Sequence, residues 1–198
     1  IKGYDNKLDA TEKIIRENIE IADPDTDYYT AVLTAAGEIP GGYSSKLNVG
    51  LESEMQADAA TRVLLRSLLD TMRDNLQGTK DDIDSEFLHD FRVAIRRTRS
   101  ALSQIRNVFD PADVDKYKQA FAWLGSITGP TRDLDVFLLS YADYRDSLPI
   151  RLQPDLEPFQ QFLLEHQALE QKSLRRRLSN RKFYQLLDEW EDFLSHEM

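Results

Sequence analysis

The sequence predicts an all-α protein built as an antiparallel helical bundle. Apolar residues recur with the 3.6-residue period of a helix along most of the chain. No stretch alternates apolar and polar residues for long enough to indicate a β-strand. Helix-start and helix-stop residues separate the periodic segments, and the links between them are mostly short, which favours antiparallel neighbours.

Periodic segments follow one another from near the start of the chain to its end. We expect helices at about 5–20, 26–36, 52–77, 85–109, 111–127, 131–147, 155–178 and 180–197.

Residues with special backbone preferences set the expected helix ends. Gly78 predicts the end of one helix, and Ser85 can cap the next. Asp110 followed by Pro111 supplies an N-cap with proline at the first helical position. The triplet Gly129-Pro130-Thr131 predicts a break and a fresh start, with Asp133 in the first turn, where the helix dipole favours a negative charge.

The chain divides into two parts at a segment without periodicity. Residues 39–50 are rich in Gly and Ser and are interpreted as a linker. The prediction is therefore an acidic N-terminal helical segment with its linker, residues 1–50, followed by a helical domain at 51–198. Residues 1–60 hold twelve acids and five bases.

Composition narrows the classes of protein to consider. With 198 residues, 41% of them hydrophobic and 30% charged, the chain is long enough to fold around a core. The lack of cysteine excludes disulfides, thiolate metal sites and thiol nucleophiles. No apolar run reaches the ~20 residues of a membrane span and no signal peptide is visible, so we expect a cytoplasmic protein without membrane association. A net charge of -10 argues against nucleic acid as a partner.

A basic island interrupts this acidity. Residues 91–109 carry five arginines and no acid. On a helix, one polar stripe about 100° wide is formed by His89, Arg92, Arg96, Arg99, Ser103 and Arg106. Like charges at this spacing repel each other, so the sequence predicts that an anion neutralises this arginine row, Arg92, Arg96, Arg99 and Arg106. Guanidinium groups match phosphate oxygens because they present a planar fork of donors.

The island and a later motif resemble those of a known family. His-x-x-Arg-x-x-x-Arg-Arg-x-Arg-Ser-Ala-Leu begins at His89, and Gly125 and the sequence TRDLDV at 131–136 follow it. This pair of motifs is similar to that of the CHAD family, the conserved-histidine α-helical domain, over residues 52–198.

The resemblance implies a fold, a ligand and partners. CHAD domains are all-helical, with two similar bundles around a basic groove. They are understood to bind inorganic polyphosphate. The resemblance therefore implies a cytoplasmic protein that can associate with polyphosphate granules. The second bundle usually carries its own His and Lys/Arg helix, and this sequence has no second copy. We therefore expect the first bundle, alone or with part of the second. In some family members the CHAD domain follows a triphosphate-tunnel (CYTH) domain in the same chain. The resemblance therefore makes a CYTH domain a candidate partner, although this sequence has no CYTH signature.

Two residues near the row have open roles. His89 either donates to phosphate directly or hydrogen-bonds a neighbouring helix and fixes the geometry of the row. Arg97 points away from the stripe, and we expect it to pair with a carboxylate, Asp133 or Asp135, although a ligand role stays open.

The TRDLDV motif is interpreted as structural support with one basic contribution. Asp133 is expected at a helix start and Asp135 opposite a basic helix, which leaves little reason for a metal site. Arg132 at the same helix start could add a guanidinium to a helix N-terminus that binds an anion.

Further basic residues offer candidate walls for a groove. A second wall is predicted from one face of the last part of the chain, Lys172, Arg175, Arg176 and Lys182. Its alternative is pairing with nearby surface acids. A thinner row, which is a weaker candidate, is formed by Arg62, Arg66 and Arg73.

These observations predict a non-catalytic module that binds polyphosphate. No nucleophile with an adjacent base, phosphate-binding loop or metal-binding carboxylate cluster is visible, so no catalytic residue, metal or cofactor is expected. Two alternatives stay open. One is an accessory domain that delivers substrate to a triphosphate or polyphosphate enzyme, and the other is an interaction bundle that docks an acidic protein segment.

Overall fold

A computed structural model describes residues 47–195 continuously, and residues 11, 13–15, 17–18 and 27–36 before them. The expected helix at 5–20, residues 39–46 of the expected linker and the last three residues of the chain lie wholly or mostly outside the described residues. Two compact units are present, Ile1–Ser44 and Ser45–Met198. In the first, α2 spans Tyr28–Ala35, is N-capped by Asp27 and has no buried residue.

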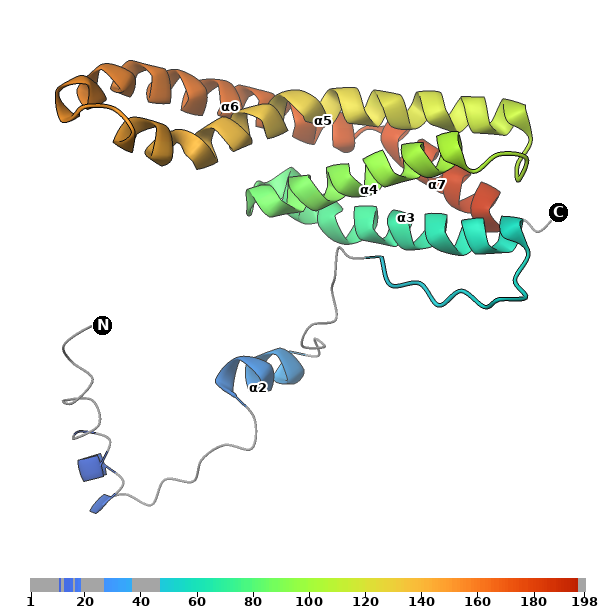
Figure 1. Ribbon diagram of the computed structural model, residues 1–198, viewed down its shortest axis with the longest axis horizontal. Helices are drawn as coiled ribbons and strands as arrows, with labels where there is room; N and C mark the ends of the chain where they lie inside the picture. The colour runs from blue at the N-terminus through green and yellow to red at the C-terminus, as the bar shows by residue number, and fades with distance from the viewer. Residues whose placement is uncertain (1–10, 12, 16, 19–26, 37–46, 196–198) are drawn as a thin grey trace. The chain divides into compact units, whose positions relative to one another are not determined.

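The second unit is all-α in its described part and contains a bundle and a projecting hairpin (Figure 1). Its elements are α3 (Ala57–Asp81), α4 (Ser85–Gln104), α5 (Pro111–Asp146), the 3-10 helix η1 (Ile150–Leu156), α6 (Glu157–Leu178) and α7 (Arg181–Ser195). α5 and α6 lie side by side as a long hairpin whose closed end, at η1, extends past α3 and α4. No helix in the described part of the chain is both long and apolar enough to cross a membrane.

One aromatic-rich core holds the bundle together. The Trp190 ring of α7 lies 4.5 Å from the Tyr117 ring and 5.1 Å from the Phe121 ring, both on α5. Phe91 of α4 and Phe183 of α7 are also fully buried. Since such side chains bury 150–250 Å² each, as a rule, these contacts dominate the packing of α4, α5 and α7.

The structure corrects the predicted end of α3. The helix continues through Gly78 and ends at Asp81, and its C-cap Asp82 adopts a left-handed φ of 54° and donates its backbone N–H to the Gly78 carbonyl. Gly78 has a packing role instead, because a Cβ atom there would lie 2.3 Å from the Phe87 ring. Asp84, rather than Ser85, caps α4, and its carboxylate accepts from the Glu86 N–H.

The predicted break at Gly129-Pro130-Thr131 is also wrong, because α5 runs unbroken through it. Pro130 removes one intrahelical hydrogen bond, but it and Ser126, whose carbonyl would accept that bond, are both exposed to water. The buried stripe continues across the proline at spacings of three and four residues, through Phe121, Leu124, Thr128, Thr131 and Asp135. The predicted N-cap at Asp110 is confirmed, with the Ala112 N–H donating to its carboxylate at 2.8 Å.

Candidate functional site

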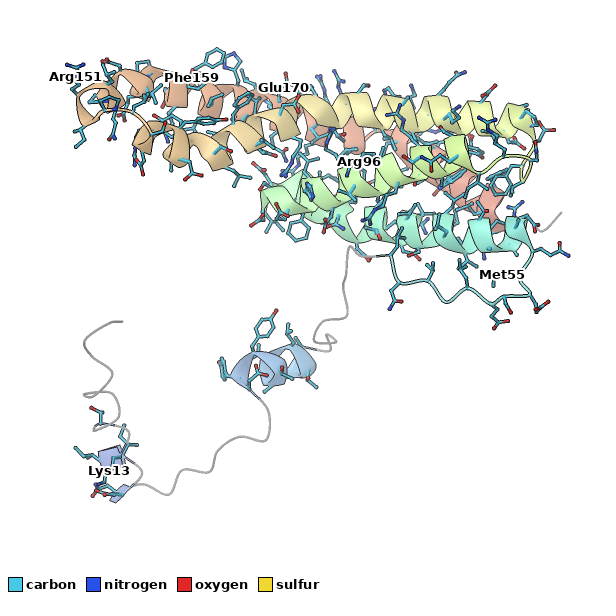
Figure 2. All side chains as sticks on the ribbon, viewed as in Figure 1. Lys13, Met55, Arg96, Arg151, Phe159 and Glu170 are labelled. Atoms are coloured by element: carbon cyan, nitrogen blue, oxygen red, sulfur yellow. The ribbon has the colours of Figure 1, made fainter. Side chains whose placement is uncertain are left out.

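The arginine row lies largely on the side of α4 that faces away from the core. The buried positions of α4 are Leu88, Phe91, Ala94, Ile95, Thr98 and Leu102. Arg96, labelled on α4 in Figure 2, and Arg99 are exposed, whereas His89 and Arg92 are half-buried. The amphipathic pattern of the sequence therefore places the guanidinium groups outside the core.

α4 and α5 together form a pocket of about 390 Å³ around this row. It is lined by His89, Arg92, Val93, Ile95, Arg96 and Arg99 of α4 and by Gly125, Arg132 and Val136 of α5. We call it the arginine pocket. Among the described residues that line it, four are arginines and none is a carboxylate.

Arg92 anchors the row to α5. Its Nη1 donates to the Gly125 carbonyl at 3.1 Å and to the Thr128 Oγ1 at 2.8 Å. Burial lowers the pKa of Arg92; nearby Asp133 opposes this shift, while Arg132 and Arg96 add to it. An anion in the pocket would offset both the burial and the repulsion.

Two glycines of α5 let the guanidinium groups approach the helix closely. A Cβ atom at Gly125 would lie 3.5 Å from Arg99 Nη1, and one at Gly129 would lie 3.8 Å from Arg92 Nη1. Any side chain larger than alanine at these positions would compete with the arginines for space. Gly125 was part of the family motif, but its contact with the row could not be read from sequence alone.

Arg132 joins the pocket from the middle of α5. Its Nη2 lies 3.0 Å from His89 Nδ1, and its Nη1 donates to the Ser85 carbonyl at 3.2 Å. Glu86, an exposed residue, is 4.0 Å from the same Nη1. The expected helix N-terminus beside Arg132 does not exist, because α5 is continuous there, so Arg132 contributes its side chain alone.

The two acids of the TRDLDV motif differ in environment. Asp133 is exposed in the middle of α5, not in a first turn as predicted. Asp135 is buried, and burial raises its pKa, with nearby Asp82 adding to the rise. Asp135 accepts a hydrogen bond from the Gln167 amide of α6 at 3.2 Å, and this bond and nearby Arg132 oppose the rise of its pKa.

The predicted second basic wall does not reach the arginine pocket. Arg175 lies 3.4 Å from Asp81, and the Lys182 ammonium lies 4.4 Å from the centre of the Trp123 ring. Lys172 and Arg176 are exposed on α6, which contributes no residue to the pocket lining.

Arg106 and Arg97 also lie outside the pocket lining. Arg106 follows the end of α4 and lines a different pocket of about 490 Å³ together with Lys118. The helix ends at Gln104 rather than continuing to 109, so Arg106 leaves the helical register of the row. Arg97 is half-buried, and its pairing with Asp133 or Asp135 stays a prediction.

The arginines of α3 hold α7 instead of forming a third row. Arg62 is buried, donates to the Phe193 carbonyl and lies 5.0 Å from the centre of the Phe109 ring. Arg66 donates to the Leu194 carbonyl at 2.6 Å. Both satisfy carbonyl groups at the C-terminal end of α7, where cations are favourable, and neither lines the arginine pocket, so their ligand role stays a prediction.

The arginine pocket also has apolar lining residues that were not predicted from the sequence. Val93, Ile95 and Val136 line it beside the arginines. Apolar character and periodicity do not distinguish a residue that lines a pocket from a residue of the core. No group of three or more potential metal ligands occurs among the described residues.

Comparisons with known proteins identify the fold. The model of one protein family, the CHAD domain, matches residues 63–198. The chain is similar to the crystal structure of the CHAD domain from the plant Ricinus communis, with a TM-score of 0.62 and 21% identity over 77% of this chain and 50% of that chain. It thus spans half the length of that structure. No curated protein matches the chain.

The matched residues make up more than half of the chain and include every residue that lines the arginine pocket. The chain therefore belongs to the CHAD family.

Proposed function

We propose that the arginine pocket binds inorganic polyphosphate without catalysing a reaction. The supporting observation is the convergence of Arg92, Arg96, Arg99 and Arg132 on one pocket whose described lining includes no carboxylate. Four guanidinium groups that repel one another in a confined space favour a ligand that carries several negative charges.

The spacing of the row suits an extended polyanion. Successive turns of a helix are 5.4 Å apart, so residues at i, i+4 and i+7 meet consecutive parts of one linear ligand. Each guanidinium group has five N–H donors, and Arg92 uses its Nη1 for two protein acceptors. The other N–H groups of Arg92 are available for phosphate oxygens. Entry of the polymer would release its condensed counterions, so we expect affinity to fall steeply with salt.

The residues beside the pocket support a binding role without catalysis. Phosphoryl transfer to water needs metal ions or equivalent clamps and a group that orients the attacking water. The arginines supply clamping charge. Asp133 is exposed, and the buried Asp135 accepts a hydrogen bond from Gln167, so neither is arranged with a second ligand set for a metal.

The test is a titration of the protein with long-chain polyphosphate at several salt concentrations. Replacing Arg92, Arg96 and Arg99 together by Ala should weaken binding by about a hundredfold or more, because hydrogen bonds to charged groups contribute ~1.5–3 kcal/mol each. The slope of log affinity against log salt should also become shallower, since fewer counterions are released.

A matched control removes the same charge elsewhere. Lys172, Arg176 and Arg177 are exposed on α6, and their replacement by Ala also removes three positive charges. We expect this control to bind nearly as the wild type does. Equal losses in the two triple variants would show that overall charge, not the pocket, determines binding.

Three further ligands separate the alternatives. Triphosphate that binds as tightly as the long chain would favour a substrate-delivery domain. Poly-glutamate that competes equally well would favour docking of an acidic protein segment. Single-stranded DNA of similar charge should bind more weakly than polyphosphate if the pocket recognises closely spaced phosphates.

A further inference from the structure

The contact between His89 and Arg132 favours one proton arrangement of the histidine. Arg132 Nη2 lies 3.0 Å from His89 Nδ1. A guanidinium group is always protonated and can only donate hydrogen bonds. The contact is therefore a hydrogen bond when His89 Nδ1 accepts, which requires a neutral imidazole with its single proton on Nε2.

This contact is one of several that hold the Arg132 side chain, only 15% of which is exposed. Arg132 crosses from α5 to the first turn of α4, where it meets the Ser85 carbonyl and His89. The carbonyl and the imidazole nitrogen take two of its five donors, and the Nε–H and the remaining Nη protons can serve a ligand.

We propose that neutral His89 is a positioning residue, which accepts from Arg132 and so orients that guanidinium group toward the arginine pocket. The inference rests on the proposed function for its ligand, and it removes the alternative in which His89 grips phosphate as a cation. Arg132 is then the ligand-binding group of this pair, and His89 acts through it.

Two near-isosteric substitutions distinguish the role of His89 Nδ1 from that of its Nε2. The Asn side chain places its oxygen two bonds from Cβ, as Nδ1 is, whereas Gln places its terminal amide atoms three bonds from Cβ, as Nε2 is. His89→Asn keeps an acceptor for Arg132, and we expect polyphosphate affinity within about threefold of the wild type. His89→Gln and His89→Ala lose that acceptor, and we expect about five- to fiftyfold weaker binding.

A double-mutant cycle tests whether His89 acts through Arg132. In an Arg132→Ala background, His89→Ala should change affinity by less than about twofold, because the group it positions is gone. An equal cost of His89→Ala in both backgrounds, or binding kept by Gln but not by Asn, would overturn the proposal, since His89 would then touch the ligand itself. Circular dichroism and thermal melting establish that each variant is folded.

A measurement without ligand keeps the inference separate from the proposed function. In ¹⁵N NMR of the free wild-type protein, we expect the His89 ring to show a protonated Nε2 and an unprotonated, hydrogen-bonded Nδ1. In Arg132→Ala, the Nδ1 resonance should shift. A proton on Nδ1, or a spectrum that Arg132→Ala leaves unchanged, would overturn the positioning role. If the NMR result holds but no polyphosphate binds, the proposed function alone fails.

Discussion

Individual charged residues in this protein take their roles from the groups they contact rather than from residue type. Arg92 and Arg62 are both withdrawn from water, yet one lines the arginine pocket and the other binds carbonyl groups at the end of α7. Asp133 and Asp135 are two residues apart, and only Asp135 is buried. Because residues two apart on a helix face different directions, the closeness of these two acids in sequence says little about shared function.

Asp135 gives a prediction about stability and pH. Burial raises its pKa in the folded state, so the folded protein holds this proton more tightly than the unfolded chain. The contribution of Asp135 to the free energy of unfolding is fully present below the ordinary pKa of an aspartate. It is lost as the pH rises through the raised pKa of the folded state. Asp135→Asn, which can still accept from Gln167, should therefore have a higher melting temperature than the wild type at pH 7.

The difference in melting temperature between the wild type and Asp135→Asn should shrink as the pH falls toward 4. The wild-type carboxyl then becomes protonated in both the folded and the unfolded state. Thermal melts across this pH range measure it, with exposed Asp133→Asn as the control. An Asn variant less stable than wild type at pH 7 would contradict this account of Asp135.

At the scale of elements, close approach between helices depends on single positions. α3 and α4 meet where the Phe87 ring lies against Gly78, and α7 is held at its C-terminal end by arginines of α3. Arg73 adds a bidentate contact with Glu191 of α7, at 2.7 and 2.6 Å. Since both side chains of this last pair are partly exposed, solvent screens the pair and we expect it to add little to stability.

Gly78→Ala should destabilise the protein although alanine favours a helix. The added Cβ would lie 2.3 Å from the Phe87 ring, which has to move. Overpacking of this kind costs about 1–3 kcal/mol, more than the ~1 kcal/mol that alanine gains in helix propensity. Urea denaturation measures the loss. Combining Gly78→Ala with Phe87→Leu should recover part of it, and a single variant as stable as wild type would show that the ring has room to shift.

At the scale of the whole molecule, the positive pocket belongs to an acidic chain. The net charge is -10, yet the described lining of the arginine pocket contains only basic, apolar and glycine residues. Negative charge elsewhere keeps the general attraction of the protein for polyanions low. We therefore attribute the proposed selectivity for polyphosphate to the local field of the arginine pocket.

We expect the purified protein to release no phosphate from polyphosphate or triphosphate, with or without Mg²⁺ or Mn²⁺. The physical reason is that the pocket has guanidinium groups but no arranged metal ligands or base among the described residues. A phosphate-release assay over hours decides this. Release that disappears in a folded Asp133→Asn or Asp135→Asn variant would mean that the protein is an enzyme.

The sequence by itself determined the all-α fold, the polar face of α4 and the N-cap at Asp110. These features depend on periodicity and capping, which are local properties of the backbone. The family motif was also readable because it lies within two contiguous segments. The continuation of the buried stripe across Pro130 was present in the sequence as well, but the glycine and proline signals pointed to a break.

Only the tertiary structure decided which basic residues share a site. It brought Arg132 to His89 across 43 positions of sequence, and it directed Arg62 and Arg66 to the end of α7. It also left Lys172 and Arg176 outside the pocket lining. The reason is that periodicity fixes the face of a helix on which a side chain lies, whereas the helix that meets this face is chosen by packing between distant segments of the chain.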